Sequence, residues 1–280
     1  MKQRLITAVF GFAVLAPVLL FSDTLVLPAA VAIFSAIAIL EMLGCIGLKK
    51  RPEVLIPSAL YAFAGPIVVR YLPKYTSLSS TLALIAAISF IYLFYLLCIT
   101  VVSKGTKNVL DIALTFMTTI YISIGFSSIV MIRDQKHGQF LILLVFIGAW
   151  VTDGAAYFVG RVLGKHKLIP DVSPKKTVEG AVGGIIFCAI SFVIYGIIVG
   201  KFSASNAKII ELVISGVIIA IISEFGDLIA SLIKRHYGIK DYGKIFPGHG
   251  GVMDRFDSII AIAPFLLMMC AFPNIYALFV

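Results

Sequence analysis

Charged residues are scarce in this sequence. Aspartate, glutamate, lysine and arginine make up 13% of its 280 residues, whereas about 25% is usual in a soluble domain. Hydrophobic residues make up 60%, and the mean hydropathy is +1.06. This balance excludes an ordinary soluble domain and predicts a protein with several membrane-spanning segments.

Cysteine is also rare, and its four copies show no pairing pattern. Cys45, Cys98, Cys188 and Cys270 lie within or at the edge of apolar segments, without C-x-x-C or C-x-x-H spacing. We therefore interpret them as small buried hydrophobic residues, and neither as disulfides nor as zinc ligands. The sequence also lacks an internal repeat and a low-complexity tail.

Nine apolar segments are long enough to cross a bilayer, whose hydrocarbon core of ~30 Å needs about 20 helical residues. The predicted fold class is all-α, a polytopic bundle of about nine transmembrane helices. A basic start followed by an apolar run is typical of a signal peptide, but eight more apolar segments favour an uncleaved first helix. The expected spans are residues 5–21, 24–43, 54–72, 78–102, 109–132, 138–160, 178–200, 207–230 and 257–279.

The basic residues predict the orientation of these spans. With a cytoplasmic N-terminus, 17 of the 23 lysines and arginines fall on the cytoplasmic side, as the positive-inside rule requires. The two long polar loops, 161–177 and 231–256, then face the cytoplasm. Membrane orientation and anionic lipid headgroups explain the net charge of +9 better than nucleic acid does. We expect residues 1–137 to carry the first five spans without a recognisable motif, and 138–280 to form the catalytic region.

A polar, glycine-rich stretch from Ser231 to Asp257 interrupts the apolar sequence. Carboxylates flank both of its ends. Glu224 and Asp227 precede it, and Asp254 and Asp257 lie at its C-terminal end. Such oxygen ligands suit a hard cation such as Mg²⁺. The basic side chains and glycine backbone between them suit phosphates. The stretch therefore predicts metal-assisted phosphoryl or nucleotidyl transfer. Its basic residues are Lys234, Arg235, Lys240, Lys244 and Arg255.

Each of these features also has a plainer interpretation. Glu224 and Asp227 could lie in solvent at a helix end, and the two later aspartates could cap the next helix. The glycines could form an ordinary turn between two helices, although a glycine-rich backbone before a helix is also an anion site. His249 could contact phosphate or brace the loop by a hydrogen bond.

A second motif region runs from residue 150 to residue 184. Asp153 is an acid inside an apolar helix, where ionisable groups are costly and tend to be functional. The later Ser173-Pro174 pair could be a helix N-cap followed by proline at the first helical position. Lys175 and Lys176 could be simple membrane anchors. Acids near other segment ends are expected to be solvated or structural, namely Glu41, Asp111 and Glu211.

Both regions resemble the phosphatidate cytidylyltransferases, the CDP-diacylglycerol synthases. The second region matches their Asp-x-x-Ala-Tyr-x-x-Gly-Arg and SPKKT-x-E-G elements, at 153–161 and 173–180. The stretch 231–257 matches their longer signature without a departure. The resemblance implies an integral enzyme of the cell (inner) membrane that joins CTP to phosphatidic acid at the cytoplasmic face and releases pyrophosphate.

The residue types and the resemblance together predict roles for individual residues, in three sets. The catalytic set is Asp227, Asp254, Lys234, Arg235 and Arg255. The metal set, for Mg²⁺ with room for a second cation, is Asp227, Asp254, Asp257 and Glu224. The substrate-binding set is Asp153, Arg161, Ser173, Lys175, Lys176, Thr177, Glu179, Lys240, Asp241, His249, Gly250 and Gly251.

Two other function classes stay open at this point. A CTP-dependent lipid kinase of the dolichol or phytol kinase kind would transfer the γ-phosphate instead. A membrane transporter would use the same acids as pathway carboxylates, although the polar loop rich in Gly, Lys and Asp argues against it. The expected partners are CTP, phosphatidic acid and membrane lipids, with no nucleic acid, and a homodimer is also considered.

Overall fold

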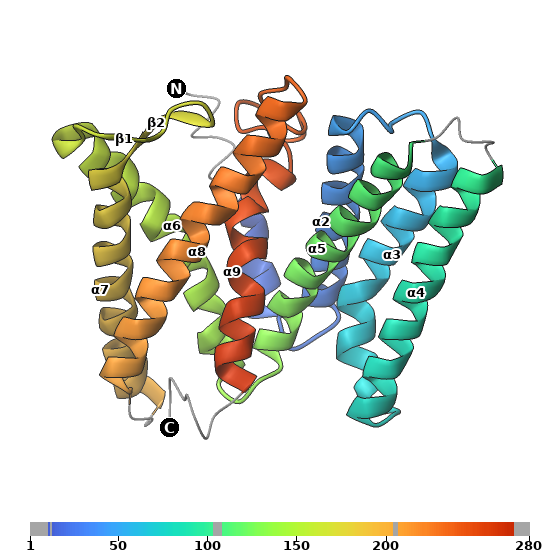
Figure 1. Ribbon diagram of the computed structural model, residues 1–280. Coiled ribbons are helices and arrows are strands. Elements are labelled where there is room, and N and C mark those ends of the chain that lie inside the picture. Colours follow the sequence, from blue (N-terminus) through green and yellow to red (C-terminus); the bar gives the residue numbers. More distant parts are fainter. Residues whose placement is uncertain (1–10, 12, 103–107, 204–206, 272–280) are drawn as a thin grey trace. The chain divides into compact units, whose positions relative to one another are not determined.

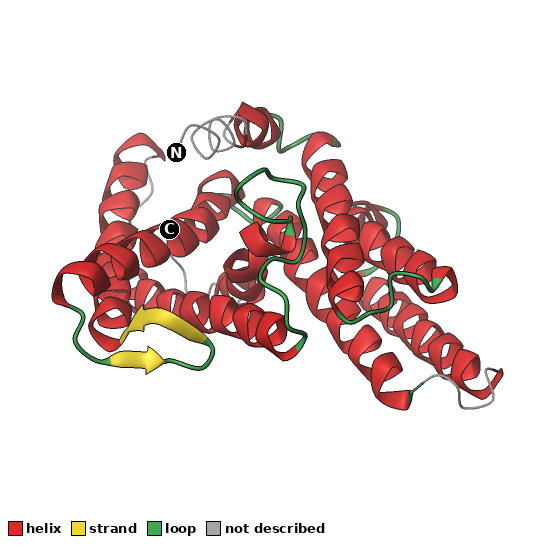
Figure 2. Ribbon diagram, turned by 90° about the horizontal axis from the view of Figure 1, so that it is seen from above, coloured by secondary structure: helices red, strands yellow, loops and turns green. Residues whose placement is uncertain are grey.

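The computed structural model describes residues 11, 13–102, 108–203 and 207–271. Long helices account for most of this part of the chain (Figures 1 and 2). Their bounds are α2 (Val26–Cys45), α3 (Pro52–Tyr71), α4 (Leu78–Val102), α5 (Val109–Arg133), α6 (Gly138–Leu163), α7 (Val178–Ser203), α8 (Ile209–His236) and α9 (Met253–Ala271). A short 3-10 helix, η1 (Leu72–Lys74), follows α3.

Seven of the described helices, α2 to α8, are long and apolar enough to cross a membrane. This confirms a nearly all-α protein with several candidate membrane spans. Each of these helices begins within a few residues of its expected span. The count of nine stays a prediction, because residues 5–10 and 12 of the first expected span and residues 272–279 of the last lie outside the described residues.

The expected loop 161–177 contains a small antiparallel sheet, which an all-α fold class did not include. Strands β1 (Lys167–Ile169) and β2 (Ser173–Thr177) pair with Lys167 opposite Thr177. Ser173 is therefore not a helix N-cap, and that interpretation was wrong. The cap is Thr177, whose Oγ1 accepts a hydrogen bond of 3.1 Å from the Gly180 N–H in the first turn of α7.

Helix α8 extends further than expected and ends at His236. The predicted loop 231–256 is therefore shorter, because its first six residues are helical and α9 begins at Met253. Lys234 and Arg235 lie in the last turn of α8. Cations are favourable there because the helix dipole is negative at its C-terminus.

The described chain forms two compact units. The first takes its residues from 1–131 and 241–254, and the second from 132–240 and 255–280. In the first unit α2 packs on α3, and α3 contacts α4. In the second unit α6 packs against α7 and α8, which also pack on each other (Figure 1). Strand β2 contacts both α6 and α7, so the hairpin is fixed to one end of that helix pair.

Small residues allow the helices of the second unit to approach closely. A Cβ added to Gly216 of α8 would lie 2.6 Å from the Ala189 Cα of α7. A Cβ added to Gly160 of α6 would lie 3.5 Å from the Gly180 Cα of α7. Such contacts are typical of membrane helices, which gain little from hydrophobicity and depend on close packing.

We expect Gly216→Ala to destabilise the second unit, because the new methyl group would meet helix backbone rather than a movable side chain. Overpacking of this kind costs about 1–3 kcal/mol, which should lower the thermal midpoint of the purified protein by several degrees. The matched control is Gly154→Ala on α6, where nothing lies within 4 Å of the added Cβ. An equal thermal midpoint for both variants would contradict this account of the packing.

Candidate active site

Two carboxylates and one ammonium group form the centre of the site, all within the second unit. Glu224 and Asp227 lie one turn apart on α8, and the Glu224 side chain is buried. Lys176 reaches them from β2. Its Nζ lies 2.5 Å from Glu224 Oε2 and 2.9 Å from Asp227 Oδ2. The hairpin thus supplies a cation to two acids that share one helix face.

The strand geometry selects which of two neighbouring lysines reaches the acids. Successive side chains of a strand point to opposite faces, so Lys175 is exposed while Lys176 is half-buried against α8. Burial alone would lower the pKa of Lys176, but the carboxylates of Asp227 and Glu224 outweigh it and hold the pKa above its ordinary value. Lys176 is therefore an ammonium ion at neutral pH.

The second carboxylate oxygen of Glu224 has no hydrogen-bond partner among the described residues. Glu224 Oε1 is buried and accepts no hydrogen bond from the part of the chain that the structure describes. A buried polar atom without a partner costs free energy, so the site still attracts a positive group after Lys176 has bound. A bound cation would remove that cost.

Two further acids surround this centre. Asp257 of α9 is buried and interacts electrostatically with Asp227. Asp153 of α6 interacts with Asp227, Glu224 and Lys176. Helix α9 comes this close because Gly226 faces it: an added Cβ would lie 3.1 Å from the Asp257 carbonyl oxygen. Four elements of the second unit therefore contribute charged groups to one place.

Two more cations belong to the same electrostatic group. Lys234 is buried and interacts with Asp257, and Arg255 is exposed and interacts with Asp153. The described residues contain no set of three or more His, Cys, Asp or Glu side chains already gathered closely enough to hold a metal ion. Lys176 lies against two of the acids instead.

Asp254 lies in the first unit, where it braces the glycine-rich loop. Its buried Oδ2 accepts the backbone N–H groups of Tyr242, at 2.8 Å, and of Gly251, at 2.9 Å. The Gly251 N–H is therefore directed at this carboxylate. Gly250 has a φ of +86°, in the left-handed region that favours glycine. These bonds give Asp254 a structural contact, and its predicted role as a metal ligand stays a prediction.

Glu41, which the sequence placed among the acids expected to be solvated or structural, makes structural contacts. Its carboxylate accepts the backbone N–H of Val252, at 3.1 Å, and of Met253, at 2.8 Å, where α9 begins. A usable signal was present, because Glu41 is an acid within a long apolar segment. The same argument had singled out Asp153.

Some predicted substrate residues hold the hairpin to α7. Glu179 accepts backbone N–H groups from Lys165, at 3.1 Å, and from His166, at 3.2 Å. The His166 ring also lies 2.6 Å from Glu179 Oε1. Thr177 caps α7, as described above, and Arg161 is exposed with Nη1 3.4 Å from the Tyr157 hydroxyl. Their predicted contacts with substrate stay untested.

The remaining predicted residues differ in their surroundings. His249 Nδ1 is buried and has no hydrogen-bond partner among the described residues, which suits a ligand contact. Arg235 is exposed and donates from Nη1 to the Ile239 carbonyl at 3.2 Å. Ser173 is half-buried, while Lys240 and Asp241 are exposed.

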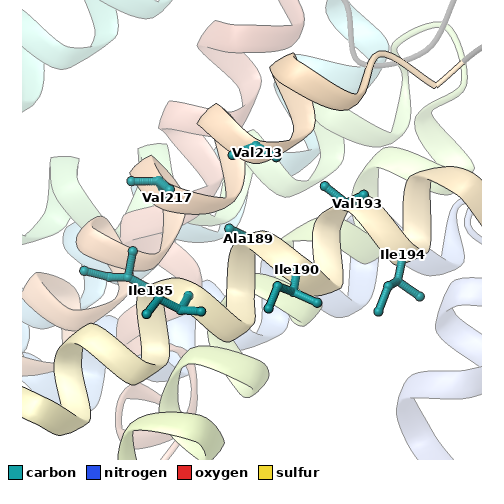
Figure 3. Close-up of a pocket in the computed structure, with 8 residues that line it drawn as sticks. Ile185, Ala189, Ile190, Val193, Ile194, Val213 and Val217 are labelled. Carbon is teal, nitrogen blue, oxygen red and sulfur yellow. The ribbon is translucent and has the colours of Figure 1, made fainter.

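An apolar hollow of about 380 Å³ lies between α7 and α8 (Figure 3). Aliphatic side chains line it, including Ile185 and Ile190 of α7 and Val213 with Val217 of α8. No charged or hydroxyl side chain takes part in this lining. A nucleotide would find no polar partner there, so the hollow is not part of the charged site.

Comparisons with known proteins give one consistent result. A model of the cytidylyltransferase family matches residues 2–272. A Staphylococcus saprophyticus protein named phosphatidate cytidylyltransferase is 38% identical over 268 residues, covering 95% of this chain and 97% of its own length. Proteins of the same name from Staphylococcus haemolyticus and Staphylococcus aureus are each 36% identical over 269 residues, with the same coverage. This chain therefore belongs to the cytidylyltransferase family.

Proposed function

We propose that the chain is an enzyme that transfers a cytidylyl group from CTP to phosphatidate, forming CDP-diacylglycerol for phospholipid biosynthesis. Family membership and the name of the similar staphylococcal proteins support the reaction. The structural observation that supports this reaction is the cluster of Glu224, Asp227 and Lys176. One buried oxygen of Glu224 lacks a hydrogen-bond partner among the described residues.

The chemistry requires charge neutralisation and alignment more than a covalent nucleophile on the protein. A phosphatidate oxygen attacks the α-phosphorus of CTP and forms a new P–O bond. The bond between the α-phosphorus and the bridging oxygen breaks, and pyrophosphate leaves with that electron pair. Both substrates are strongly anionic, so the site must supply cations at the reacting phosphates.

The acids of the site fit a hard divalent cation such as Mg²⁺. Carboxylate oxygens are the ligands that this ion prefers, and buried Glu224 Oε1 lacks a partner among the described residues. We assign Asp227 and Asp254 as the main ligands, the latter from the sequence motif alone. Glu224 and Asp257 are further candidates, and a second cation could share the site. When bound, the metal would neutralise charge on the triphosphate.

The basic residues would hold the phosphates. Lys176 is already an ammonium ion at the acids, and a bound cation would free it to contact an anionic substrate. Lys234 and Arg255 interact with other acids of the cluster. Arg235 and Lys175 are exposed and can reach phosphate from solvent. His249, with its unpartnered Nδ1, is assigned a phosphate contact.

We further propose that the site faces the cytoplasm of a cell whose inner membrane holds the enzyme. The apolar helices support a membrane protein. The orientation rests on the basic residues, 17 of 23 of which fall on one side when the N-terminus is cytoplasmic. CTP would then reach the site from solution, and phosphatidate would reach it from the bilayer.

Product analysis tests the reaction. Purified protein given phosphatidate, Mg²⁺ and CTP labelled at the α-phosphate should form a labelled lipid, whereas a γ-label should appear in pyrophosphate. Excess chelator should abolish both products, and added Mg²⁺ should restore them, because the acids need a cation. A γ-label found in the lipid would instead identify a lipid kinase. Full turnover in excess chelator would remove the metal from the proposal.

Cysteine labelling tests the orientation. Lys240 is exposed after α8 on the side predicted to be cytoplasmic, and Lys201 is exposed near the end of α7 on the opposite side. In intact cells a membrane-impermeant maleimide should label Lys201→Cys and should not label Lys240→Cys. The labelling of the parent, with its four native cysteines, is subtracted as background. Inverted vesicles should give the reverse. Labelling of Lys240→Cys from outside would contradict the orientation.

A further inference from the structure

Glu41 caps a helix that lies far from it in the sequence. It belongs to α2, yet its two carboxylate oxygens accept the N–H groups of Val252 and Met253, which are 211 and 212 residues further along. The first N–H groups of a helix have no partner within the helix. A negative charge at that end is also favoured by the helix dipole. Glu41 therefore caps the start of α9 from another helix.

The loop before α9 is built around this carboxylate. A Cβ added to Gly243 would collide with Glu41 Oε1, and a Cβ added to Gly251 would collide with both carboxylate oxygens. The two glycines also approach each other, since the added Gly243 Cβ would lie 3.0 Å from the Gly251 Cα. Glycine is thus needed at both positions to leave room for the Glu41 side chain.

Asp254 is tied to the same assembly. It accepts N–H groups from Tyr242, which precedes Gly243, and from Gly251, which is itself one of the two glycines that contact Glu41. The Glu41 carboxylate therefore binds the start of α9, and the Asp254 carboxylate, in the first turn of α9, binds the loop before it. Moving Glu41 would move the loop, and the loop orients the Asp254 carboxylate.

We propose that Glu41 is a positioning residue for the transfer reaction, acting through the loop 241–254 and Asp254 without touching either substrate. The inference rests on the proposed function, in which Asp254 binds the metal ion. It also accounts for an acid inside an apolar helix, where an ionisable group would otherwise be costly. A purely structural cap would affect the stability of the fold and leave turnover by the folded enzyme unchanged.

The first test is Glu41→Gln, which keeps the shape of the side chain. Glutamine can accept only one of the two N–H groups and turns its own NH₂ toward the other. We expect kcat to fall by about 10-fold to 100-fold, as small misplacements in active sites do, while KM for CTP changes by less than about threefold. The Mg²⁺ concentration for half-maximal activity should rise. Glu53→Gln, an acid at the start of α3 in the same unit, is the matched control.

A second readout does not depend on activity. Hydrogen exchange of the amides in 241–254 should be faster in Glu41→Gln than in the parent, because one of the Val252 and Met253 N–H groups loses its acceptor. Glu53→Gln should leave this exchange unchanged. If the parent enzyme fails to make CDP-diacylglycerol, the proposed function fails, and this exchange result still reports on the loop separately.

The variant Gly243→Ala keeps the Glu41 residue but should displace its carboxylate. It should reproduce the fall in kcat, because its methyl group occupies the space of the carboxylate. With Glu41→Ala measured as the second single variant, the double variant Glu41→Ala/Gly243→Ala should lose much less than the product of the two single losses, since both changes disrupt one contact. Parental kcat in folded Glu41→Gln and Gly243→Ala, with only a lower thermal midpoint, would overturn the proposal and leave a structural cap.

Discussion

The ammonium group of Lys176 between Glu224 and Asp227 is the interaction on which the site depends. Two acids on one face of an apolar helix repel each other. Lys176 neutralises part of this charge at 2.5 and 2.9 Å. It reaches the acids because a two-stranded hairpin holds it beside α6 and α7. The remaining negative charge, including that on Glu224 Oε1, is what the proposed metal ion would neutralise.

Glycine contacts place the other charged groups around that centre. Gly226 lets α9 approach α8, which brings Asp257 to Asp227. In the first unit, Gly243 and Gly251 leave space for Glu41, which anchors the loop that bears Asp254. These glycines therefore serve two purposes. Gly226 permits close helix packing. Gly243 and Gly251 allow the backbone to surround the Glu41 carboxylate, which accepts hydrogen bonds from backbone N–H groups.

The sequence predicted the apolar helices well, because span length and hydropathy are local properties. It also singled out the acids of α8 and α9, since ionisable groups stand out in apolar segments, although their roles stay predictions. The hairpin was missed because strands of three and five residues give almost no periodic signal. Glu41 was expected to be solvated or structural, but its partners could not be predicted because they are more than 200 residues away. The bonds from Tyr242 and Gly251 to Asp254 likewise depend on tertiary folding, which a motif does not encode.

The most direct test of the account is a double-variant cycle across the central ion pair. Turnover of CTP to CDP-diacylglycerol would be measured for Lys176→Met, Asp227→Asn and the double variant, with Lys165→Met, an exposed lysine before the hairpin, as control. Each single variant should lose at least ~10²-fold, as expected for a main electrostatic contributor. The double should lose far less than the product, because the pair acts as one unit. Near-parental turnover in Lys176→Met, or a fully multiplicative double loss, would contradict the account.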